Sequence, residues 1–99
     1  MGKYFKVDES IACPNHFMIT VNHEEFYIKH TLGSCNVISA RVMNLSYASY
    51  LRMCRDKFKA EIYGKGSKYP IAYFKDKENA NSLVKILNEY ADRIIKERS

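Results

Sequence analysis

The sequence has few of the features that mark secreted or disordered proteins. It contains only two prolines, four glycines and three cysteines in 99 residues, and 46% of its residues are hydrophobic. Disordered chains lack apolar and aromatic residues, so this composition predicts a folded protein. An odd number of cysteines at irregular spacing does not indicate a disulfide framework. We therefore expect a single domain over residues 1–99 with one hydrophobic core.

Long apolar segments are absent as well. No run approaches the roughly 18 residues that a membrane-spanning helix needs. The opening residues, MGKYFKVDES, contain no apolar stretch typical of a signal peptide. The sequence therefore predicts a cytoplasmic protein that has no membrane partner.

The sequence patterns of common enzymes are also missing. There is no Gly-x-Ser-x-Gly elbow, and no cysteine stands in a local catalytic signature. Gly64-Lys65-Gly66 precedes a predicted strand instead of a helix, and it lacks the Lys-Ser/Thr pair of a phosphate-binding loop. We predict that the protein is not an enzyme.

One pair of residues resembles half of a zinc site. Cys13 and His16 are separated by two residues, and His23, His30 and Cys35 follow. Structural zinc sites usually combine two such close pairs, whereas His30 and Cys35 are five positions apart across a glycine turn. We expect no metal and no cofactor.

Charge is distributed unevenly along the chain. Between Arg52 and Lys77 there are eight basic and three acidic residues, a difference of five that equals the net charge of the whole chain, +5. The remaining residues hold eight of each sign. A local basic field suits a phosphate-bearing partner, because neutralised phosphates release counterions. A solvated, lysine-rich surface is the alternative explanation.

Hydrophobic periodicity predicts the secondary structure. Alternation predicts strands over 16–22 and 24–30, a further strand over 36–43 and a candidate edge strand over 3–7. Ser46 is a suitable N-cap for a helix through Phe58, whose apolar residues recur at helical spacing. Residues 58–77 predict a strand, a glycine turn and a second strand.

The last predicted element is a long amphipathic helix. Asp76 is its N-cap, and Leu83, Leu87 and Ile94 belong to its apolar stripe. We expect these three side chains to be buried with Tyr50, Leu51, Ile62 and Phe74. The order is three strands, a helix, two strands and a helix. It predicts an α+β two-layer sandwich of the ferredoxin-like type, with one antiparallel sheet of four to five strands and both helices on one face.

Part of the chain resembles the core of an RNA-recognition motif. Asn44-Leu45, Phe74, Ala80 and Leu87-Asn88 occupy places where that family has characteristic residues, and the match covers about sixty residues. The resemblance implies a strand–helix–strand–strand–helix order. Two positions whose aromatic side chains stack on bases in that family correspond to Arg41 and Ile71 here, and Tyr69 keeps an aromatic side chain at a stacking position.

A second resemblance concerns residues 47–66 together with 69–74. These segments, YASYLRMCRDKFKAEIYGKG and YPIAYF, are similar to short uncharacterised proteins from phages and mobile elements of Gram-positive bacteria. This resemblance implies a small phage-borne regulator or inhibitor of host defence, for example of the anti-CRISPR type.

Strand alternation also predicts which side chains lie on the open face of the sheet. If Ala60, Ile62, Ala72 and Phe74 face the helices, tyrosines and basic residues face outward. The predicted binding residues are Tyr27, Lys29, Arg41, Lys59, Tyr63, Lys65, Lys68, Tyr69 and Tyr73, with Arg52 and Arg55 as a second basic patch.

Two kinds of partner fit such a face. Aromatic residues stack on bases while lysine and arginine contact phosphates, which predicts a small binding protein for nucleic acid or a nucleoprotein complex. Tyrosine and arginine are also enriched where proteins bind one another, so a protein–protein inhibitor or regulator is the alternative. A homodimer is compatible with either reading.

Overall fold

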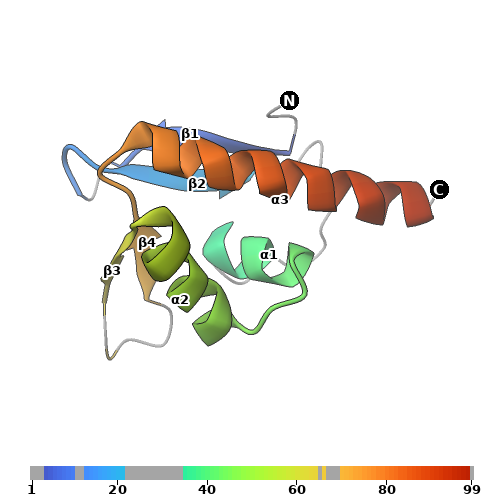
Figure 1. Ribbon diagram of the computed structural model, residues 1–99, viewed down its shortest axis with the longest axis horizontal. Helices are drawn as coiled ribbons and strands as arrows, with labels where there is room; N and C mark the ends of the chain where they lie inside the picture. Colours follow the sequence, from blue (N-terminus) through green and yellow to red (C-terminus); the bar gives the residue numbers. More distant parts are fainter. Residues whose placement is uncertain (1–3, 11–12, 22–34, 65, 67–69, 99) are drawn as a thin grey trace.

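The computed structural model describes residues 4–10, 13–21, 35–64, 66 and 70–98 (Figure 1). Within these ranges the chain forms three α-helices and two separate two-stranded antiparallel sheets. In chain order the elements are β1 (Phe5–Glu9), β2 (Phe17–Val21), α1 (Cys35–Val42), α2 (Tyr47–Phe58), β3 (Glu61–Tyr63), β4 (Ile71–Tyr73) and α3 (Lys77–Arg98). The fold is α+β, and the predicted two-layer sandwich with a single sheet of four to five strands is wrong.

The longest helix organises the molecule. α3 runs beside the β1–β2 ribbon, with α1 and α2 below it, and the β3–β4 ribbon stands at one end next to α2 (Figure 1). None of the helices in the described ranges has both the length and the apolar character needed to cross a membrane.

Among the described residues, the two ribbons are joined by one β-bridge, between Phe17 and Phe74. The Phe17 N–H donates to the Phe74 carbonyl at 2.7 Å, and the Phe74 N–H donates to the Phe17 carbonyl at 2.8 Å. Beyond this pair β2 packs against α1, and the chain after Phe74 turns into α3. Strand pairing therefore stops after one step, so a continuous sheet does not form.

The largest error concerns residues 36–43, which were expected to form a strand, whereas Cys35–Val42 form the helix α1. Asn36, Ile38, Ser39, Ala40 and Val42 are all buried in this short helix. A helix buried on nearly every side has no polar face, and periodicity cannot then distinguish it from a buried strand. The strand–helix–strand–strand–helix order implied by the RNA-recognition-motif resemblance is consequently not formed.

The predicted strands at the N-terminus have different outcomes. The candidate edge strand 3–7 is formed two residues later as β1, which pairs with β2 so that Phe5 lies opposite Val21 and Glu9 opposite Phe17. The expected strand over 24–30 lies outside the described residues.

The prediction for α2 is confirmed. The Ser46 side chain accepts a hydrogen bond from the Ser49 N–H and caps the helix, which ends at Lys59 in the left-handed conformation with φ of 57°. Tyr50, Leu51 and Cys54 form its buried stripe.

The prediction for α3 is also confirmed. The Asp76 carboxylate accepts from the Glu78 N–H at 2.9 Å at its start, and Leu83 and Leu87 are fully buried. Phe74 is buried as well, whereas Ile62 and Ile94 are half-buried and pack against the core.

Candidate functional site

An open groove lies between α2 and β3. It has a volume of about 490 Å³, and the side chains that line it come from one face of α2 and from the start of β3. These residues are Ala48, Leu51, Arg52, Arg55, Ala60, Glu61 and Ile62. The groove therefore combines an apolar floor with two guanidinium groups.

Local sequence explains the geometry of this groove. Ala48, Arg52 and Arg55 are spaced four and three residues apart, which places them along one face of a helix. The left-handed conformation at Lys59 then reverses the chain, and the Ala60 N–H donates to the Cys54 carbonyl at 3.0 Å. This reversal places β3 beside the helix that precedes it.

The two arginines differ in their surroundings. The Arg55 guanidinium contacts Asp56 through both carboxylate oxygens, at 2.8 and 3.3 Å, and both side chains are exposed. This contact lowers the pKa of Asp56, and the charge of Arg52 lowers it further. Arg52 itself is exposed and forms no ion pair within the described part of the chain. Its guanidinium is therefore available to an anionic ligand.

A polar cluster at the edge of the groove surrounds the carboxylate of Glu61. Its Oε1 accepts from the Tyr63 hydroxyl at 3.0 Å and contacts His16 Nε2 at 3.2 Å, while Oε2 lies 3.2 Å from Lys75 Nζ. The hydrogen bond from Tyr63, together with those from Lys75 and His16, lowers the pKa of Glu61. Glu61 is the one acidic residue among the described residues that line the groove, and its neighbours thus compensate its charge.

The tyrosines of the β3–β4 ribbon are unequally accessible. Tyr63 is 41% exposed, whereas Tyr73 is only 7% exposed, so the prediction that Tyr73 lies on an open face is wrong. The two rings meet edge to face with centroids 5.3 Å apart, and the His16 ring meets Tyr63 in the same way at 5.9 Å. The turn before β2 lies against this face, which the sequence prediction had left uncovered.

The alternation itself was predicted correctly. Ile62 lies opposite Ala72, and Glu61 lies opposite Tyr73. The side chains expected to face the helices and those expected to face outward are therefore on opposite faces of the ribbon. What the pattern does not show is which segment packs on each face. The contact between His16 and Glu61 joins residues 45 positions apart and has no local sequence signal.

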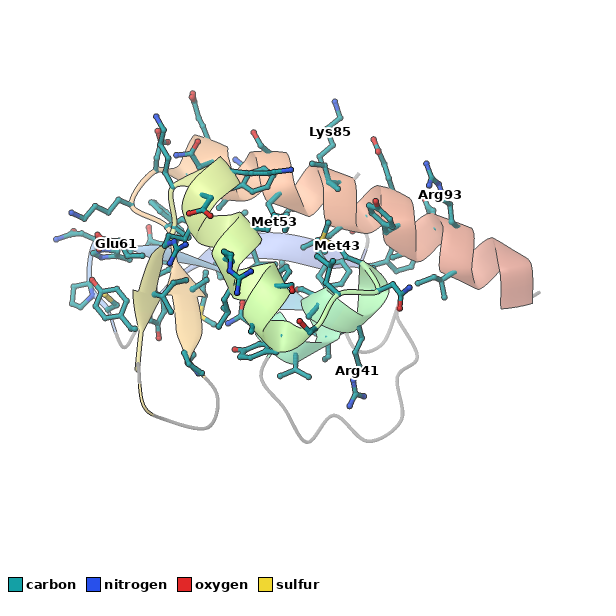
Figure 2. The ribbon with its side chains drawn as sticks, turned by 60° about the horizontal axis from the view of Figure 1, so that its bottom comes forward. Arg41, Met43, Met53, Glu61, Lys85 and Arg93 are labelled. Carbon is teal, nitrogen blue, oxygen red and sulfur yellow. The ribbon has the colours of Figure 1, made fainter. Side chains whose placement is uncertain are left out.

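Of the remaining predicted binding residues, the two that the structure describes, Arg41 and Lys59, do not lie on the β3–β4 ribbon. Arg41 is exposed, but it extends from α1 well away from Glu61 of β3 (Figure 2). It was expected on a strand of the open sheet, and the helical conformation of this segment moves it elsewhere. Lys59 is exposed at the end of α2 and precedes β3 instead of belonging to it. Tyr27, Lys29, Lys65, Lys68 and Tyr69 lie outside the described residues.

Further exposed basic side chains lie on the elements that form the groove and on the segments next to them. They come from α2, from its C-cap, from the link between β4 and α3 and from the first residue of α3: Arg52, Arg55, Lys57, Lys59, Lys75 and Lys77. The sequence identified Arg52 and Arg55 as a separate patch, but it missed the apolar floor between them and β3. No group of three or more histidine, cysteine or acidic residues that could hold a metal ion is found in the described ranges.

Comparisons with known proteins gave no match, since no family model fits the chain and no curated protein or solved structure is significantly similar to it.

Proposed function

We propose that the protein binds nucleic acid, alone or within a nucleoprotein complex, through the surface formed by α2 and the β3–β4 ribbon. The observation that carries this proposal is the position of Arg52 and Arg55 beside an open apolar groove. Both belong to residues 52–77, the segment that holds the entire excess of positive charge. Guanidinium groups contact phosphates in a planar, often bidentate geometry.

The surrounding lysines support the same conclusion. Lys57, Lys59, Lys75 and Lys77 are exposed on neighbouring elements. Long-range attraction of a polyanion requires such a cluster more than it requires any individual ion pair. The Arg55–Asp56 contact does not oppose binding strongly, because ion pairs between exposed side chains contribute little to stability. Phosphate can therefore replace Asp56 as the partner of Arg55.

The groove adds an apolar contact that phosphate binding alone does not need. Ala48, Leu51 and Ile62 offer an apolar surface for the flat face of a base. Bases contact apolar and aromatic side chains while their phosphates contact basic residues, which is the usual arrangement in proteins that bind single strands. The groove therefore suits a nucleotide better than an isolated phosphate.

Fluorescence anisotropy of a labelled oligonucleotide tests the proposal. Affinity is expected to fall steeply between about 50 and 200 mM salt, because binding releases counterions from the phosphates. A regulator that contacts another protein through tyrosine, the alternative from the sequence, needs no such dependence. Absence of binding at low salt, or an affinity unaffected by salt, contradicts the proposal.

A further inference from the structure

His16 lies at the end of a tight turn that leads into β2. Its N–H donates to the Cys13 carbonyl at 3.2 Å, and its carbonyl accepts from the Ser10 N–H at 2.9 Å. The Ser10 hydroxyl accepts from the Cys13 N–H at 3.0 Å. Asn15 has φ of 65°, a left-handed conformation that asparagine adopts more readily than most residues. These short-range hydrogen bonds fix the turn, and the His16 ring packs against Tyr63 of β3.

Both nitrogens of the His16 ring face hydrogen-bond acceptors. Nδ1 lies 3.0 Å from the Pro14 carbonyl oxygen, and Nε2 lies 3.2 Å from Oε1 of Glu61. A carbonyl and an ionised carboxylate can only accept. A neutral imidazole carries a hydrogen on one nitrogen, whereas the imidazolium carries one on each. Only the protonated ring can therefore donate to both partners at once and link the turn to β3.

The titratable and charged groups described around this ring come from four segments. They are Cys13 of the turn, Glu61 and Tyr63 of β3, Tyr73 of β4 and Lys75 of the link to α3. The hydrogen bond to Glu61 and the neighbouring Cys13 raise the pKa of Tyr63 to about 12. The same hydrogen bond, with Lys75 and His16, lowers the pKa of Glu61. Glu61 therefore stays ionised and Tyr63 stays neutral between about pH 5 and 8, where histidine ordinarily changes its charge.

We propose that protonation of His16 strengthens the binding of nucleic acid at the groove between α2 and β3, so that the protein binds more tightly in mildly acidic solution. Glu61 lines that groove, and its carboxylate is the group that Nε2 of His16 contacts. With the imidazolium present, one cation lies at each carboxylate oxygen, His16 at Oε1 and Lys75 at Oε2. The proposal rests on the proposed function and describes how the same site is regulated.

Loss of the proton from His16 changes the charge at the groove. Lys75 is then the remaining cation at the Glu61 carboxylate among the described residues, so the negative charge is less well compensated and repels a phosphate nearby. One charge interaction near an exposed surface changes an affinity by about two- to fivefold. We expect an effect of that size between the two protonation states of His16.

A direct contact between the imidazolium and a phosphate is the competing explanation. Both ring nitrogens of His16 are already directed at acceptors of the protein, and only 13% of the side chain is exposed. The ring therefore has no hydrogen directed at a ligand. His16 is a positioning residue in this account, because it acts on the ligand through the carboxylate of Glu61.

Titration of the full chain with a labelled single-stranded oligonucleotide at about pH 5.5 and 8, at one salt concentration, tests the proposal. The unmodified protein should bind about two- to fivefold more tightly at the lower pH. His16→Gln should remove this difference, because glutamine can donate to one acceptor but cannot gain a charge. His23→Gln and His30→Gln, at histidines outside the described residues, are the matched controls and should keep it. Loss of the difference in a control, or its persistence in His16→Gln, overturns the proposal.

Glu61→Gln separates the proposal from direct contact with phosphate. Removal of the carboxylate should raise the affinity at about pH 8 close to its value at about pH 5.5, because no negative charge is left for His16 to compensate. A pH difference that persists in Glu61→Gln but disappears in His16→Gln shows that the imidazolium contacts the ligand itself. That result overturns the action of His16 through Glu61.

Calorimetry of the unmodified protein provides a measurement that does not depend on the folding of a variant. Coupling between two binding events is reciprocal, so binding of the oligonucleotide at about pH 6.5 should take up a fraction of a proton. Titrations in two buffers with different heats of ionisation measure this uptake. Salt-dependent binding with no proton uptake and equal affinity at both pH values overturns the inference and leaves the proposed function intact. Absence of binding at either pH shows that both are wrong.

Discussion

The side chain of Asn88 on α3 forms the hydrogen bonds that a neighbouring strand would give to Phe5 of β1. Its Oδ1 accepts from the Phe5 N–H at 2.9 Å, and its Nδ2 donates to the Phe5 carbonyl at 3.3 Å. Oδ1 also accepts from the Tyr4 N–H at 3.2 Å. The Asn88 side chain thus occupies the backbone hydrogen-bonding groups of Phe5 at the edge of β1, and α3 covers that edge. Covering with a helix is one way in which proteins protect exposed strand edges.

Replacement of Asn88 by Leu should destabilise the protein by about 2 to 4 kcal/mol, because buried N–H and C=O groups of β1 lose their partners. Asn88 is 4% exposed, so water cannot easily replace the amide. Chemical denaturation measures the change, and Glu89→Ala, at the neighbouring exposed position, should stay within about 0.5 kcal/mol. A loss for Asn88→Leu no larger than that of the control shows that the edge of β1 does not depend on this side chain.

Removal of the buried hydroxyl of Tyr50 should, in contrast to the replacement of Asn88, cost little stability. Its side chain is fully buried between α1 and α2, and its hydroxyl has no hydrogen-bond partner among the described residues although Ser39 and Cys54 lie near it. Tyr50→Phe removes only this hydroxyl, so the free energy of unfolding should change by less than about 1 kcal/mol or increase. Thermal and chemical denaturation check this. A loss of about 2 kcal/mol or more reveals a hydrogen bond that the structure does not contain.

Leu87 tests the packing of α3. The side chain has no exposed surface, and it belongs to the core cluster with Phe5 and Tyr50. Leu87→Ala should cost about 2 to 5 kcal/mol through lost burial and the cavity that remains. Denaturation of the variant beside Lys85→Ala, an exposed position on the same helix, gives the comparison. A loss below about 0.5 kcal/mol, typical of surface positions, contradicts this packing.

Glu61 should make the folding stability of the protein depend on pH in the acidic range. Its pKa is lowered in the folded state, first by the Tyr63 hydroxyl and then by Lys75 and His16. A lowered folded pKa contributes stability that is fully present above the unfolded pKa, about 4.3 for glutamate, and is lost as the pH falls through the folded value. Glu61→Gln should therefore flatten part of the decline in melting temperature below that pH. Identical acid profiles for the two proteins contradict this role of Glu61.

Sequence patterns could identify α2 and α3 because each has one buried and one exposed face. Period-two spacing also identified the alternation within the β3–β4 ribbon, although Tyr73 is buried on the face that was expected to be open. These patterns could not identify α1, where Ile38, Ser39 and Ala40 are all buried and no polar face remains. The single pair between Phe17 and Phe74 depends on how whole elements pack, and no local signal encodes it.

The features of the candidate site also fall into two groups, those that local sequence patterns identify and those that depend on tertiary packing. Arg52 and Arg55 were found from charge and helical spacing, which are local properties. The burial of Tyr73 and the groove beside Ile62 arise from tertiary contacts, which alternation along a strand does not contain.

The slope of log affinity against log salt concentration, compared between two single variants, tests the proposed binding surface most directly. Arg52→Gln and Arg93→Gln each remove one positive charge, but Arg52 lines the groove, whereas Arg93 lies over the Tyr90 ring on α3, far from Glu61 (Figure 2). For an oligonucleotide, we expect Arg52→Gln to weaken binding and to reduce the slope by about one unit, as the loss of one phosphate contact requires. Arg93→Gln should leave the slope unchanged. Equal slopes and affinities for the two variants show that net charge alone attracts the ligand and contradict binding at the groove.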